Sequence, residues 1–166
     1  MLIYHPAFDA YHCVFRFISL IEACTQLEVE KACILDFYLV FPASIASIRL
    51  PQELTSIRST ARRLENPYHD PFNAKRVFKD MRGIQEEALR CLAAANFIDA
   101  DRFEGGVMHR TQRIISEDLK NTTTEFIRRG GETRQFVLQH LSKINLSGPD
   151  GLKARTGLLE FRYDPV

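Results

Sequence analysis

The sequence has no excess of charge of either sign, because 22 lysine and arginine residues stand against 21 aspartate and glutamate residues. Such a balance gives no overall electrostatic attraction to nucleic acid or to a membrane surface, so binding of that kind would need a local basic patch. Long apolar runs are also lacking: the stretch 32–46 is interrupted by Asp36, Pro42 and Ser44 and is too short to span a bilayer. The first residues lack the basic region and cleavage site of a signal peptide. We therefore expect a soluble, cytoplasmic protein.

Cysteine pairs at metal-binding spacing are missing as well. The four cysteines, Cys13, Cys24, Cys33 and Cys91, lie far apart, with no C-x-x-C pair and no histidine doublet beside them. A zinc site of usual spacing is therefore not expected, and we predict neither a metal nor a cofactor. Scattered cysteines in a chain of this length are typical of reduced core residues in a cytoplasmic protein.

The motifs of common enzyme classes are absent too. The doublets Gly105-Gly106 and Gly130-Gly131 lack the Lys-Ser/Thr of a phosphate-binding loop, and we interpret them as a bend and a helix break. Neither a G-x-S-x-G elbow nor an H-E-x-x-H pair occurs. The neighbours His69 and Asp70 are the most enzyme-like feature, but no nucleophile or electrophile for them to serve is identifiable. We therefore predict a protein that is not an enzyme, and keep a small hydrolase using these two residues as a third hypothesis.

The residues that are present predict one mainly helical domain. With 166 residues, 45% hydrophobic and 26% charged, the chain can bury a core of its own. Apolar spacing predicts a helix over 8–24 and a second over 29–41, which is apolar nearly all round and is stopped by Pro42. Either a partner protein covers this second helix or it lies at the centre of the core; the sequence leaves both open. The partner-binding candidates on these two helices are Phe8, Tyr11, Phe15, Phe37, Tyr38 and Phe41.

The remainder of the chain predicts further helices and a small β component. Asn73 and Ser116 are good N-caps for helices that follow them, and the second of these is expected to break at Gly130-Gly131. Strands are expected over 103–111 and 158–163. The predicted fold class is mainly α with a small β component: a single domain over 1–166, with an N-terminal apolar helical part (1–50) and a winged-helix-like remainder.

Basic residues gather in the middle of the chain, where eight of them lie between Arg49 and Arg82 against four acidic residues. If they lie together, they would neutralise a few phosphates of double-stranded DNA. A solvated helix face explains the same pattern. The candidate DNA-binding residues are Arg62, Arg63, Lys75, Arg76, Lys79 and Arg82.

Three stretches are distinctive together: Tyr4 to Arg16, Ile34 to Pro42, and the loop Asn66 to Phe72 with the helix exit Leu92 to Asp99. In this order the chain resembles the middle component of bacterial ABC-three-component systems, the group that includes the Lamassu-type anti-phage defence subunit. The resemblance implies a non-catalytic adaptor between an ABC- or SMC-type ATPase and an effector, often a nuclease, in a complex that senses phage or plasmid DNA. It carries over no catalytic residues. The alternative is a free-standing winged-helix DNA-binding regulator.

Overall fold

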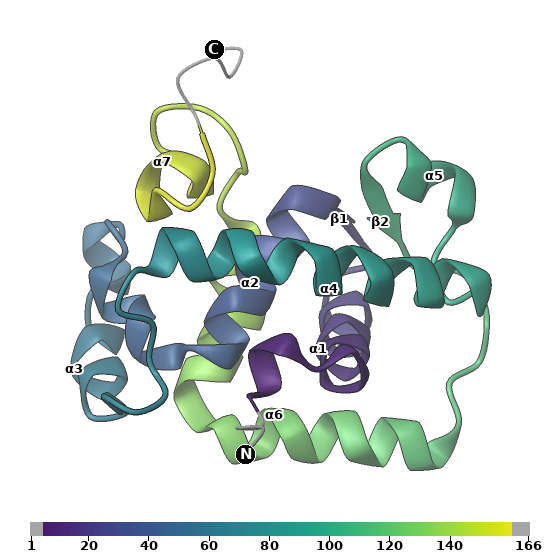
Figure 1. The fold of residues 1–166 in the computed structure, drawn as a ribbon, viewed down its shortest axis with the longest axis horizontal. Coiled ribbons are helices and arrows are strands. Elements are labelled where there is room, and N and C mark those ends of the chain that lie inside the picture. Colours follow the sequence, from purple (N-terminus) through teal and green to yellow (C-terminus); the bar gives the residue numbers. More distant parts are fainter. Residues whose placement is uncertain (1–4, 161–166) are drawn as a thin grey trace.

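Four long helices form three layers (Figure 1). The computed structural model describes residues 5–160. Helices α4 (Ala74–Ala94) and α6 (Glu117–Gln139) run along opposite sides of the molecule, and α1 (Ala10–Ala23) and α2 (Val29–Val40) lie between them. The predicted predominance of helix is confirmed.

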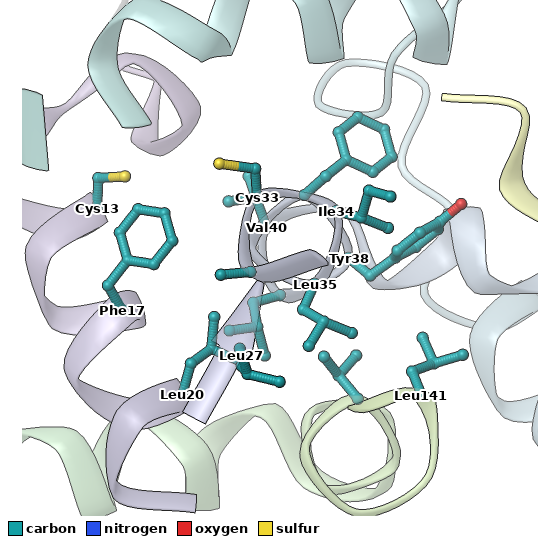
Figure 2. Packing of buried hydrophobic residues seen from close by; sticks show 14 of the residues in the cluster. Cys13, Phe17, Leu20, Leu27, Cys33, Ile34, Leu35, Tyr38, Val40 and Leu141 are labelled. Carbon is teal, nitrogen blue, oxygen red and sulfur yellow. The ribbon is translucent and has the colours of Figure 1, made fainter. Parts of the chain in front are cut away.

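Helix α2 lies at the centre of the core. Ten of its twelve residues are buried, and Figure 2, which looks along its axis, shows its side chains pointing in all directions. Helices α1, α4 and α6 all contact it. This finding decides between the two alternatives that the sequence left open: the second apolar helix is covered by its own chain.

Side-chain caps fix where the long helices begin. Asp9 caps α1 by accepting from the backbone N–H of His12 at 3.0 Å. Asn73 and Ser116 cap α4 and α6 in the same way, as predicted. The expected break in α6 is also confirmed, because Gly131 has φ 58° and ψ −144°, which no helix contains.

The sheet has two short strands that are distant in the sequence. Strand β1 (Gln26–Glu28) pairs antiparallel with β2 (Val107–His109), with Leu27 opposite Met108. The sequence did not reveal β1, and the strand predicted over 103–111 is only partly formed, because α5 (Ala100–Glu104) occupies its start.

Shorter elements complete the fold. They are η1 (Pro6–Phe8), η2 (Pro42–Ser47), η3 (Gln52–Leu54), α3 (Ile57–Arg62), η4 (Leu141–Lys143) and α7 (Leu152–Thr156). The closing strand predicted over 158–163 is not formed in residues 158–160, and the rest of it lies outside the described residues. The two strands of the sheet do not form the expected helix–strand–strand ending, so the described part of the chain does not show a winged helix.

Candidate partner-binding surface

The six aromatic residues predicted to bind a partner separate into two groups. Phe8 and Tyr11 are 47% and 68% exposed, and Phe15 is half-buried. Phe37, Tyr38 and Phe41 are buried in the chain's own core and present no surface to a partner in this fold. Their burial follows from the central position of α2, and the rings of Phe37 and Phe41 lie 5.0 Å apart inside the core.

The exposed group forms what we call the aromatic face, which consists of Phe8, Tyr11 and Phe15. The imidazole Nδ1 of His5 accepts from the N–H of Ala7 and so begins the short 3₁₀ turn that carries Phe8. Tyr11 and Phe15 stand one turn apart on α1, and their rings meet edge to face at 4.5 Å. The aromatic face therefore draws on two neighbouring elements, η1 and the first half of α1.

A histidine pair joins the aromatic face to the loop 66–72. The rings of His5 and His69 stack at 4.7 Å, and His5 Nε2 lies 3.3 Å from the carbonyl oxygen of His69. Phe41 supports both rings from inside, at 5.6 and 5.5 Å. His69 Nδ1 is 3.9 Å from the Asp70 carboxylate, too long for a hydrogen bond. The contacts of His69 are therefore those of a packing residue that fixes two surface segments together.

The predicted DNA-binding residues lie on either side of this loop. Arg62 and Arg63 are exposed at the end of α3, and Lys75, Arg76 and Lys79 are exposed on the first turns of α4. Arg82 differs from the other five: it is half-buried, lies over the ring of Phe78 and lines a separate groove.

That groove has a volume of about 630 Å³ and lies between α2, the C-terminal half of α4 and α5. Leu89 and Phe103 contribute to its apolar lining, together with the buried Cys33. Burial raises the pKa of the Cys33 thiol to about 12. The thiol is therefore protonated at neutral pH and is a poor nucleophile.

A buried polar cluster holds the inner helices together, and the sequence did not reveal it. Arg16 of α1 donates to Asp36 of α2 through Nε at 2.5 Å and through Nη2 at 3.3 Å. Gln85 of α4 donates to the same carboxylate at 2.9 Å. Burial opposes the charge of Arg16, but the charge and hydrogen bonds of Asp36 outweigh it and raise the pKa of the guanidinium. We assign the cluster a structural role, because both members of the ion pair are shielded from solvent.

Residues 5–160 contain no cluster of three histidine, cysteine or acidic side chains that could hold a metal ion. Within the same residues, no helix is long and apolar enough to cross a membrane.

Comparison with protein families gives a match that spans nearly the whole chain. The family model for middle component 5 of ABC-three component (ABC-3C) systems matches residues 2–164. The chain belongs to this family. The resemblance drawn from the sequence is thereby confirmed for the ABC-3C middle components as a group. No curated protein and no solved structure matches this middle component.

Proposed function

We propose that this ABC-3C middle component is a non-catalytic, cytoplasmic adaptor of a Lamassu-type anti-phage or anti-plasmid defence system. In this proposal it links an ABC- or SMC-type ATPase to an effector nuclease and helps the assembled complex to contact DNA. The family match over residues 2–164 carries the proposal, because a middle component works together with the other components of its system.

The aromatic face supports a protein-binding role. Exposed aromatic side chains are costly in water, and aromatic residues are enriched at the centres of protein interfaces. The His5–His69 stack holds η1 against the loop 66–72, so Phe8 is presented on an anchored segment. A surface that is ordered before binding loses little conformational entropy when a partner docks.

The adaptor role is tested by co-expression with the two neighbouring genes, with an affinity tag on the ATPase. We expect the wild-type chain to be recovered stoichiometrically, and the double variant Phe8→Ala, Tyr11→Ala to be recovered at least about tenfold less, as expected when interface aromatic anchors are lost. Ile114→Ala is the matched control, because Ile114 is 86% exposed but lies outside the aromatic face. A wild-type chain that ignores its neighbours and purifies as a lone dimer binding a specific duplex would instead support the regulator.

The DNA role is tested separately on the assembled complex. Charge reversal by Arg62→Glu with Arg63→Glu should weaken DNA binding and reduce its dependence on salt, since fewer counterions are released. Unchanged binding would remove the DNA role and leave the adaptor role intact.

A further inference from the structure

The segment 62–79 combines unpaired positive charge with exposed aromatic rings, and we call it the basic loop segment. It runs from the end of α3 through the loop 66–72 into the first turns of α4, at one end of the molecule (Figure 1). Five of its residues are basic and two, Glu65 and Asp70, are acidic. The basic residues are Arg62, Arg63, Lys75, Arg76 and Lys79.

These five cations have no ion-pair partner within residues 5–160. Other exposed arginines do: Arg90 lies 2.6 Å from Glu86, and Arg128 lies 2.6 Å from Glu125. The acidic Asp70 is engaged within the loop, where its carboxylate accepts from the N–H of Asn66 at 2.7 Å. The positive charge of the segment is therefore available to an external anion.

Two aromatic rings lie between the basic ends of the segment. Tyr68 is 98% exposed and Phe72 is fully exposed. The loop that carries them is held in place, because the N–H of Tyr68 donates to the side chain of Asn66 at 3.1 Å and His69 stacks on His5. Tyr68 and Phe72 are thus presented to solvent from an anchored backbone.

We infer that the basic loop segment binds single-stranded nucleic acid, with bases stacked on Tyr68 and Phe72 and phosphates held by the five cations. This inference rests on the DNA role within the proposed function and specifies its ligand. Proteins track a single strand by combining cations, which hold the phosphates, with flat rings on which bases stack. Bases in a duplex are stacked on each other and offer no free face to the two rings, and an acidic peptide would use only the cations.

Fluorescence anisotropy on the purified full chain tests the inference. Labelled oligo-dT and oligo-rU of equal length are titrated beside a duplex of that length, which separates a DNA strand from an RNA strand and both from paired DNA. We expect tighter binding of a single strand than of the duplex. Five phosphate contacts should give a slope of log affinity against log salt of about −3.5, and Arg62→Gln with Arg63→Gln should reduce its magnitude by about 1.4.

Variants of the two rings provide the decisive comparison. Tyr68→Ala with Phe72→Ala should weaken single-strand binding by at least about tenfold, whereas the exchange Tyr68→Phe with Phe72→Tyr should preserve it, because stacking needs a flat ring and no particular base. Ile114→Ala is the control and should bind as the wild type does. Co-purification with the neighbouring components should survive the loss of both rings, so failure of this inference is distinguishable from failure of the adaptor role.

Three results would overturn the inference. Equal affinity for duplex and single strand, unaffected by loss of the rings, would mean contact with phosphates alone. Displacement of the oligonucleotide by polyglutamate at equal charge concentration would mean a general site for acidic chains, as in a protein contact. Absence of binding to every oligonucleotide would reduce the segment to a solvated surface.

Discussion

At the scale of single residues, the Arg16–Asp36 pair determines how the inner helices fit together. The two side chains are 2% and 0% exposed, and Gln85 adds a hydrogen bond from α4, in the adjacent outer layer. A buried pair gains little net free energy over apolar residues of similar size, because both ions lose their hydration. The pair nevertheless constrains how α1 and α2 pack, because removal of either side chain leaves the other ion buried without a counterion.

We therefore expect Asp36→Ala to lower the free energy of unfolding by about 3–5 kcal/mol, because it leaves Arg16 charged and unpaired inside the core. The double variant Arg16→Met, Asp36→Leu should recover most of this loss. Urea denaturation followed by circular dichroism measures both. Arg90→Ala, which removes an exposed pair with Glu86, is the control and should shift the midpoint little. A double variant as unstable as Asp36→Ala would contradict the argument.

The cysteines give a second prediction at this scale. Burial raises the pKa of Cys33 to about 12 and also raises the pKa of Cys13, whereas Cys91 is exposed. At pH 8 the native protein should react quickly with Ellman's reagent at Cys91, and Cys13 and Cys33 should react only after unfolding. In a Cys91→Ser variant the only thiol left with partial exposure among the described cysteines is that of Cys24. Rapid reaction of more than one thiol in this variant would contradict the burial of Cys13 and Cys33.

The same thiols make stability depend on alkaline pH. A cysteine thiol of the unfolded chain ionises near its ordinary pKa of 9.0, while Cys33 in the folded chain stays protonated up to about 12. Between these values the folded state binds more protons, so the free energy of unfolding falls as the pH rises. The contribution of Cys33 to stability is complete below pH 9 and is lost towards pH 12. Cys33→Ala should flatten this decline in urea titrations.

At the scale of the elements, α6 is two helical segments joined at Gly131. Beside the break, Arg134 places its guanidinium 3.6 Å from the centre of the Phe126 ring and donates to the carbonyl oxygen of Phe126. Burial and the charge of Arg16 lower the pKa of Arg134 to about 10. A Cβ atom at Gly130 would overlap the Arg134 side chain, so this glycine leaves the space through which Arg134 reaches back to Phe126.

Two glycine substitutions should have opposite effects on stability. Gly131→Ala should cost about 1–3 kcal/mol, because φ 58° with ψ −144° is strained for any residue with a Cβ atom. Gly83→Ala should gain up to about 1 kcal/mol, because Gly83 is exposed and helical and an added Cβ atom meets nothing within 4 Å. Thermal unfolding of both variants measures these effects. If both substitutions raised or both lowered the stability, the strained backbone at Gly131 or the open space at Gly83 would be contradicted.

Elements with local signals were predictable from the sequence, and elements set by distant contacts were not. The caps at Asn73 and Ser116 need only the next three residues, and both were found. Strand β1 exists because Leu27 pairs with Met108, about eighty residues away, and its own three residues carry no strand signal. Arg16 falls on the polar side of its helix by spacing, yet it is buried because Asp36 approaches from α2.

The candidate site shows the same division. Apolar spacing identified Phe8 and Tyr11 together with Phe37, Tyr38 and Phe41 as candidate partner-binding residues. It did not reveal which of these side chains are buried by the chain's own helices and which are left for a partner. Tyr68 and Phe72 were passed over because a proline-rich loop has no periodicity to reveal exposure. Only the structure shows that both rings are exposed to solvent.

At the scale of the whole molecule, the three layers bury the central helix α2 within a single chain. Because α2 is covered by α1, α4 and α6, we expect the protein expressed alone to fold and to unfold in one cooperative transition. Size-exclusion chromatography with light scattering, and a thermal melt, test this. Aggregation of the lone chain, reversed by co-expression of its neighbours, would show that the core needs outside cover.

The layering also has a consequence for synthesis on the ribosome. The inner helix α2 ends at Val40, whereas α6, the last of the long helices that cover it, ends at Gln139. Chains grow at about 5–20 residues per second, so roughly 5–20 s pass between the two events. During that interval the nascent chain exposes a strongly apolar helix, and this is the period in which chaperones have access to it.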